Sequence, residues 1–271
     1  MPIMRVIISL LFALFCHYSN AQSGLLGLQD ARAIAMGRIS SIHQGIDAAF
    51  NNIAGLASIE SLGFVASAER RFLLNETQNF GLAAAIPSNN GAFGVRVGSF
   101  GFEAYNENSI SLGYSRQLSE RMSIGGEFIY WNRSIPEYGS QGFLTFAVGL
   151  QAKVFEQVLL GFHLFNPIRS AVNDEENTFP VVQIGVNYLV SDQLQVSAEL
   201  EKDIDFPAIF RSGIDYKIQE SLALRLGIST APTLFTAGIG LDISPAFHMD
   251  IAGSIHQILG FTPGISVQYQ K

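Results

Sequence analysis

The stretch DARAIAMGRISSIHQGIDAAFNNIAGLA (residues 30–57) is the only long part of the chain that fits no β alternation. Its apolar residues recur at spacings closer to helical than to alternating. We therefore expect one or two short helices, with Asp47 as a candidate N-cap for the turn from Ala48 to Asn51. A helix packed on a soluble core would look the same, so the rest of the chain must decide where this segment lies.

The composition points to a membrane. Hydrophobic residues make up 48% of the 271 residues and charged residues only 14%, and the mean hydropathy is +0.26. Beyond the N-terminus no apolar run approaches the roughly 18 to 20 residues of a transmembrane helix. Apolarity spread through Gly-rich alternating segments is typical of a transmembrane barrel, in which every second residue faces lipid. The net charge of −7 without basic clusters argues against nucleic acid as a partner.

Residues 1–21 read as a secretory signal peptide. Arg5 supplies a basic start, residues 6–15 an apolar core, and Ser19-Asn20-Ala21 a small-x-small cleavage site. A lipoprotein site at Cys16 is disfavoured because Phe15 is too large for the position before a lipidated cysteine. Removal of the signal deletes the only cysteine, so we expect no disulfide, no Cys-based metal site and no cofactor in the mature chain.

The remainder, residues 61–271, divides into hairpins. Short polar tips such as residues 118–121 and 190–193 alternate with longer connections such as residues 132–141 and 166–178, which is the asymmetry of outer-membrane barrels. Strands of about ten residues plus a connection give roughly 14 strands. We predict an all-β fold: a closed transmembrane antiparallel β-barrel of about 14 strands in the outer membrane, with residues 22–60 as a short helical plug in the lumen.

Aromatic residues are predicted to form two girdles at the membrane interfaces. The periplasmic girdle would contain Tyr114, Tyr188, Tyr216 and Tyr269. The outer girdle would contain Tyr130, Trp131, Phe162, Phe206 and Phe235.

The inward face of the predicted strands carries charges of both signs, which a polar lumen tolerates and a sandwich core does not. These are Arg96, Glu127, Glu199, Glu201, Arg211, Asp215 and Arg225, with Lys153, Asp242 and Asp250. They would form either a charged constriction in a pore or a network of salt bridges that joins strands and anchors the plug. The interleaved signs favour the network.

The opening stretch resembles the N-terminal signature of the FadL-like outer-membrane proteins, and most closely the PorV/PorQ branch of Bacteroidetes. The resemblance rests on Asp30, Arg32, Met36 and Gly37 in its first half and on Asp47, Asn52, Ala54, Gly55 and Leu56 in its second. The chain departs from the family pattern at Asp30, where Gly is usual, and at Ile53, where Pro is usual. We expect Ile53 to let the segment continue as helix, which Pro would constrain.

The resemblance implies two roles. PorV-like members serve type IX secretion as docking components, and FadL-like members pass hydrophobic molecules through the plug and sideways through the wall. Because the outer loops read as short and polar, the sequence favours an accessory that docks in type IX secretion, with a channel for hydrophobic small molecules as the alternative. The expected partners are outer-membrane lipid, a secretion or surface protein, and, in the alternative, a hydrophobic ligand.

Three other chemistries are weighed and disfavoured. His163, His248 and His256 would suit a Ser/His hydrolase, but no GxSxG-like elbow accompanies them, so we predict no enzyme. The acidic loop at residues 173–177 lacks the spaced ligands and turn Gly of a calcium loop. Gly238 and Gly240 lie in an alternating strand with no following helix, so they make room for the plug and do not bind a dinucleotide.

Overall fold

The computed structural model describes residues 28–271 except 168–169, 172–176, 179 and 205. The predicted signal peptide, residues 22–27 of the predicted plug and most of the acidic loop, from Asn173 to Glu176, lie outside the described residues. Within the described part, none of the helices has the length and apolarity that crossing a membrane requires.

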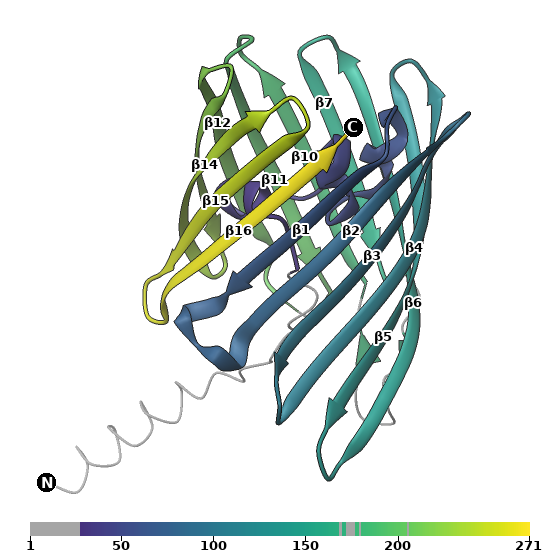
Figure 1. Ribbon diagram of the computed structural model, residues 1–271, viewed down its shortest axis with the longest axis vertical. Helices are drawn as coiled ribbons and strands as arrows, with labels where there is room; N and C mark the ends of the chain where they lie inside the picture. Colours follow the sequence, from purple (N-terminus) through teal and green to yellow (C-terminus); the bar gives the residue numbers. More distant parts are fainter. Residues whose placement is uncertain (1–27, 168–169, 172–176, 179, 205) are drawn as a thin grey trace, which may run out of the picture.

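Fourteen antiparallel strands close into one barrel, with β1 paired to β16 (Figure 1). This confirms the predicted fold class and strand number. The separate pair β8 (Ser170–Ala171) and β9 (Asn177–Thr178) lies outside the barrel sheet. The barrel strands are β1 (Gly63–Arg70), β2 (Gln78–Ser88), β3 (Gly91–Phe102), β4 (Tyr105–Ser119), β5 (Met122–Ile135), β6 (Gly139–Phe155), β7 (Val158–Phe165), β10 (Val181–Leu189), β11 (Leu194–Asp203), β12 (Ile209–Gln219), β13 (Leu222–Thr230), β14 (Thr233–Ser244), β15 (Phe247–His256) and β16 (Gly260–Gln270).

The side chains alternate between the two faces of the wall. In β13, Leu224 and Leu226 are 42% and 60% exposed, whereas Arg225 between them is 4% exposed. The barrel thus turns its apolar residues outward and its polar residues inward, the reverse of a soluble protein. Only a lipid environment removes such an outer surface from water.

The turns at one end of the barrel are all short, as predicted, whereas the other end mixes long and short connections. The longer connection predicted at residues 132–141 was wrong, because β5 runs to Ile135 and β6 begins at Gly139. The short-turn end includes the turns after Ser119 and Ser244, and the wall is tallest over β3 to β6 at the other end (Figure 1). Tyr188 and Tyr216 point outward near the short turns, as predicted for a girdle. The outer girdle was predicted wrongly at Trp131 and Phe206, because both line the lumen; Trp131 is only 5% exposed.

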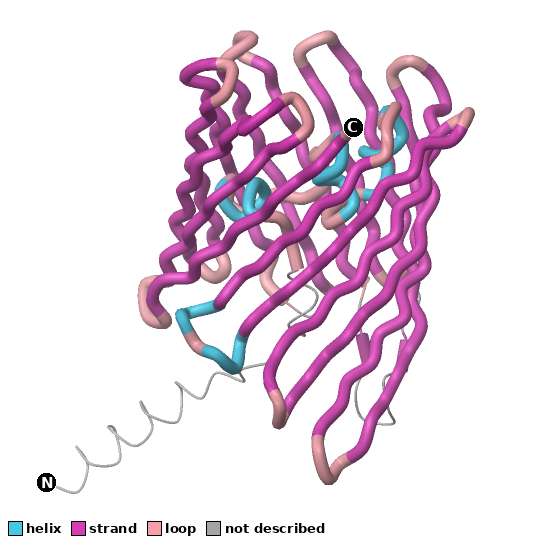
Figure 2. The backbone as a smooth tube through the Cα atoms, in the orientation of Figure 1, coloured by secondary structure: helices cyan, strands magenta, loops and turns pink. Residues whose placement is uncertain are grey.

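Residues 28–59, which we call the inner segment, lie inside the barrel nearer its short-turn end (Figure 2). They form the α-helix α2 (Ala31–Ala35) and the 3₁₀ helices η2 (Gly45–Ala49) and η3 (Ile53–Ser58). Outside the barrel wall and inner segment, η4 (Arg71–Leu73) and η5 (Asn75–Thr77) connect β1 to β2.

Two local expectations for the inner segment were wrong. Asp47 does not cap a helix but lies within η2, where it accepts hydrogen bonds from Arg32 and Gln268. The caps are Asp30 for α2 and Asn52 for η3. The chain also does not continue as helix into Ile53: η3 begins there, at a position where Pro is tolerated.

Inward glycines bring the inner segment against the wall. A Cβ atom at Gly125 would lie 2.7 Å from Ile53, and one at Gly213 would lie 2.7 Å from the Met36 carbonyl oxygen. At Gly238 it would lie 2.6 Å from Ala35, which agrees with the role predicted from the sequence. The same prediction was wrong for Gly240, which makes room for the Arg225 guanidinium. Backbone and side chains of the inner segment thus occupy the space that larger inward residues would fill.

Candidate functional site: the lumen and its inner segment

The first half of the family-like motif is tied to the second. The Asp30 carboxylate accepts from the Ala33 amide (3.3 Å) and from Asn51 Nδ2 (2.6 Å). Arg32 bonds Asp47 of the second half at 3.3 Å and Asp215 of β12 at 3.1 Å. The motif residues Asp30, Arg32 and Asp47 therefore fold the inner segment on itself and attach it to the wall.

Gly37 meets a backbone requirement. Its φ is +77°, and a Cβ there would lie 2.7 Å from the Ile228 carbonyl oxygen. Its amide donates to Thr236 Oγ1 (2.9 Å), whose hydroxyl donates to the Ala35 carbonyl (2.8 Å). This close approach seats the end of α2 on β13 and β14, with the Met36 side chain fully buried beside it.

The second half of the motif is also structural. Asn52 Nδ2 donates to the carbonyls of Ser41 (2.8 Å) and Phe162 (3.1 Å), while its oxygen accepts from the Ala54 amide. Ala54 and Leu56 are fully buried, and Gly55 lies against the His43 carbonyl with no room for a Cβ. Desolvation lowers the pKa of His43 to about 4, so near pH 7 its neutral ring can bond the Ile39 carbonyl (2.9 Å).

Glu199 is the hub of the predicted charge network. Its carboxylate accepts from the amides of Ser40 (2.9 Å) and Ser41 (2.7 Å), from the Ser41 hydroxyl (2.7 Å) and from Arg211 (2.8 Å). Arg211 also bonds Glu201 at 2.7 Å. One buried carboxylate thus joins the inner segment to β11 and β12.

The remaining predicted charges form separate groups. Arg96 bonds Glu127 (3.2 Å) and donates to the Phe50 carbonyl (3.2 Å). Asp215 joins Arg32 to Arg225, and Arg225 also pairs with Asp250. The structure brings opposite charges together in each group. Their roles in the lumen stay predictions.

Two charges predicted for the lumen lie at its rim. Lys153 is exposed at the β6–β7 turn and pairs with Glu156 at 2.7 Å. The Asp242 side chain is 55% exposed and bonds His248 at 2.5 Å. Both follow the inward alternation, but their strands have already reached the short-turn end, which pattern alone does not show.

A lumen cavity of about 910 Å³ lies between the inner segment and the long connections. One side is apolar, formed by Phe50, Ile129, Trp131 and Phe165, and the other carries charged pairs. The cavity was not predicted from the sequence. The usable signal was spacing: Ile129 and Trp131 lie two and four residues after the inward Glu127, on the same face of β5.

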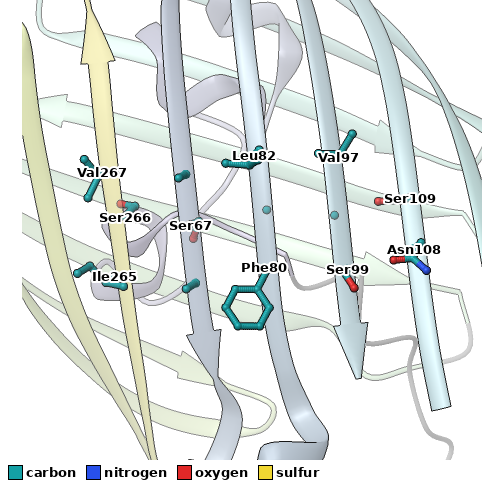
Figure 3. Close-up of a pocket in the computed structure, with 14 residues that line it drawn as sticks. Ser67, Phe80, Leu82, Val97, Ser99, Asn108, Ser109, Ile265, Ser266 and Val267 are labelled. Atoms are coloured by element: carbon teal, nitrogen blue, oxygen red, sulfur yellow. The ribbon is translucent and has the colours of Figure 1, made fainter. Parts of the chain in front are cut away.

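A groove of about 670 Å³ runs along the outer, lipid-facing surface over β16 and β1 to β4 (Figure 3). The small side chains of Ala66 and Ala68 form its base, between larger ones on the neighbouring strands. These larger side chains are Phe80, Leu82, Ile265 and Val267. Strand pairing is continuous behind the groove.

The outer groove and the lumen cavity meet back to back at Gly81. Gly81 lines the groove, and a Cβ added to it would lie 2.5 Å from the ring of Phe50 and 3.0 Å from Leu28. Phe50 and Leu28 both line the lumen cavity. Here the wall itself contributes only backbone, and the side chains of Phe50 and Leu28 lie behind it and separate the groove from the cavity.

Two of the histidines weighed for hydrolase chemistry, His163 and His256, line the lumen cavity, whereas His248 lies at the short-turn end. His163 on β7 bonds Gln183, whereas His248 on β15 bonds Asp242 and Asp250. Among the described residues, no group of three or more His, Cys, Asp or Glu side chains is arranged to hold a metal ion. The absence of enzymatic activity stays a prediction.

Comparison with known proteins gives similarity of structure but not of sequence. No protein-family model matches the chain, and no curated protein does. The toluene transporter TbuX of Ralstonia pickettii superposes with a TM-score of 0.70 at 12% identity, covering 91% of this chain and 99% of that one. The monoaromatic hydrocarbon channel CymD gives 0.67 at 13% identity, covering 91% and 98%. A Pseudomonas aeruginosa FadL homologue gives 0.64 at 11%, covering 89% and 98%.

The chain has the fold of the FadL-like barrels. At these identities the likeness extends to the fold alone. The resemblance to the PorV/PorQ branch stays a prediction, as does the origin in Bacteroidetes.

Proposed function

We propose that this protein is an outer-membrane channel that takes hydrophobic small molecules into the lumen cavity and releases them sideways through the wall near Gly81. The observation that carries the proposal is the back-to-back placement of two apolar spaces there, the cavity inside and the groove outside. A hydrophobic molecule that crosses at this point passes from the apolar cavity to the apolar groove without entering water.

The comparisons support this alternative better than the docking role that the sequence favoured. The similar structures are described as a toluene transporter and a monoaromatic hydrocarbon channel. Docking in type IX secretion needs a partner protein, and it stays a prediction. The outward apolar face of the strands supports the outer membrane as the location.

We place the sideways opening between β1 and β2, where the outward residues Ala66 and Ala68 are small. These two strands must separate there, because their pairing is unbroken from Gly63 to Arg70. Ala66 and Leu82 are register partners on these strands. The double substitution Ala66→Cys/Leu82→Cys, closed by oxidation or by a short thiol-reactive linker, ties the two strands together. The only native cysteine, Cys16, lies in the predicted signal peptide.

We expect the closed pair to reduce uptake of radiolabelled naphthalene by cells several-fold, and a reductant to restore it. The matched control is Leu226→Cys/Ala237→Cys, an outward register pair on β13 and β14, whose closure should leave uptake unchanged. Equal uptake with β1 and β2 tied would exclude this route. Uptake no higher than in cells without the protein would exclude the channel itself.

A further inference from the structure

Two nitrogen atoms of residues at the apolar side of the lumen cavity have no hydrogen-bond partner among the residues that the structure describes. They are Nε1 of Trp131 and Nε2 of His163, both buried, on residues that line the cavity. Trp131 is 5% exposed and His163 8%. A buried polar atom without a partner costs free energy, which a ligand or water that bonds it recovers.

The two residues belong to one patch of wall. The Trp131 ring meets the Phe165 ring edge to face, with centroids 5.9 Å apart. His163 lies two residues before Phe165 on β7 and therefore points to the same face. The patch thus combines an apolar aromatic surface with two polar nitrogens that lack partners among the described residues.

Neighbouring groups determine which nitrogen of His163 carries the proton. Arg211 bonds Glu201 (2.7 Å), and Glu201 accepts from Gln183 Nε2 (2.6 Å). The Gln183 oxygen therefore faces His163 Nδ1, at 2.9 Å. Since this oxygen can only accept, Nδ1 carries the hydrogen, and in the neutral ring Nε2 is a free acceptor. Trp131 Nε1, in contrast, is always a donor.

The arginines around the cavity already have carboxylate partners, with Arg38 and Arg71 sharing Glu69. Four arginines line it, and each is bonded to a carboxylate. The pairs are Arg38–Glu69, Arg71–Glu69, Arg96–Glu127 and Arg211–Glu201. Among the described lining residues, no cation is left to hold an ionised head group such as a carboxylate, whose burial would be costly without one.

We propose that the molecule taken up is an uncharged hydrophobic compound that carries a hydroxyl group, such as a cyclic or aromatic alcohol. This rests on the proposed function and narrows its substrate class. The hydrocarbon body lies against Phe165 and Trp131. A hydroxyl both donates and accepts, so it can donate to His163 Nε2 and can accept from the Trp131 N–H.

The test is calorimetric titration of the mature protein in lipid nanodiscs, with empty nanodiscs subtracted. The probes are methylcyclohexane, 4-methylcyclohexanol and 4-methylcyclohexanecarboxylate, which share one body and differ in the polar group. We expect the alcohol to bind about tenfold more tightly than the other two, because a site with buried polar groups disfavours a ligand that leaves them unpaired.

The variants separate the hydroxyl from simple packing. His163→Leu removes the acceptor and Trp131→Phe the donor, and each should weaken the alcohol about tenfold while leaving the hydrocarbon unchanged. Phe165→Leu is the matched control and should weaken all three probes alike. If His163→Leu does not fold, Gln183→Leu, which frees the imidazole tautomer, should reduce the preference for the alcohol.

The failures are distinguishable. Equal binding of hydrocarbon and alcohol, or a preference for the alcohol that survives both His163→Leu and Trp131→Phe, would overturn the hydroxyl inference and leave the channel standing. Tightest binding of the carboxylate would also overturn it. If the folded wild-type protein bound none of the probes, the proposed function would fail together with it.

Discussion

The inner segment is held in two different ways on its two sides. Towards β1 to β6, η2 and η3 pack through apolar side chains such as Phe50, Ile53 and Leu56. Towards β11 to β15, the segment is held by hydrogen bonds and ion pairs, above all at Glu199 and Asp215. Apolar packing dominates on the first side, although Arg96 also donates to the Phe50 carbonyl there. On the second side the polar anchors add to a small apolar cluster of Ala31, Ile34, Ala35 and Ala252.

The difference shows how two kinds of interaction divide the task. Apolar burial stabilises the segment without fixing its direction, since it depends on area and little on angle. Buried charges fix position through directed bonds, but each becomes costly when its partner is removed. Small changes in side-chain size should therefore be tolerated on the apolar side. On the polar side, the loss of even a few hydrogen-bonding atoms should be destabilising.

Removal of both sides at once is expected to have the largest effect. A chain without residues 22–57 should form a barrel whose lumen conducts ions in planar bilayers, because the segment fills the lumen near the short-turn end. The intact protein should give little current. A shortened barrel that is folded, as shown by heat-modifiable migration on gels, and yet closed would contradict the assignment of this segment as a plug.

Loss of the polar hub comes next. Glu199→Ala strips the buried amides of Ser40 and Ser41 of their acceptor and leaves Arg211 with one carboxylate. Breaking such a buried pair costs roughly 3–5 kcal/mol. We expect this loss in the free energy of unfolding, measured by urea titration in lipid vesicles.

Glu199→Gln is the matched control for the hub. The amide oxygen keeps an acceptor for the Ser41 amide while the charge is lost, so the loss should be clearly smaller. Equal losses for Ala and Gln would show that charge, not the hydrogen bonds to the inner segment, is the stabilising part.

A truncation on the apolar side should have a smaller effect. Ile53 is 2% exposed and packs against Gly94, Gly113 and Gly125. Ile53→Ala should cost about 3 kcal/mol and Ile53→Val about 1 kcal/mol in the same titration. A loss of stability that grows with the number of methyl groups removed indicates hydrophobic packing. Equal losses for Val and Ala would instead indicate one specific contact of the Ile53 side chain.

The wall could be predicted from the sequence because its signal is local. Alternation such as that around Arg225 places each residue inside or outside from its neighbours alone. Trp131 was misassigned because its aromatic character was weighed above its spacing from Glu127. Aromatic residues occur both in interface girdles and in cavity linings, and only the spacing along the strand distinguishes the two.

The contacts of the inner segment could not be predicted, because they join residues far apart in the chain. Ser40 and Glu199 are separated by 159 positions, and no local pattern pairs them. The inward glycines came nearest to a signal. Gly238 was correctly predicted to make room for the inner segment. That it makes room for Ala35 could be seen only in the structure.

The inner segment also has a role in assembly, at the seam where β1 pairs with β16 to close the barrel. The first strand has to find the last, and such distant pairing is slow to form. Ser67 and Ser266 face each other across this seam. Ser67 donates to the Gln29 carbonyl (2.7 Å), and Ser266 accepts from the Ala31 amide (3.2 Å). The inner segment, which is synthesised before any strand, thus acts as a template for the final closure. It bonds both edge strands at one of their register pairs, so a slip of the last strand would break its bond.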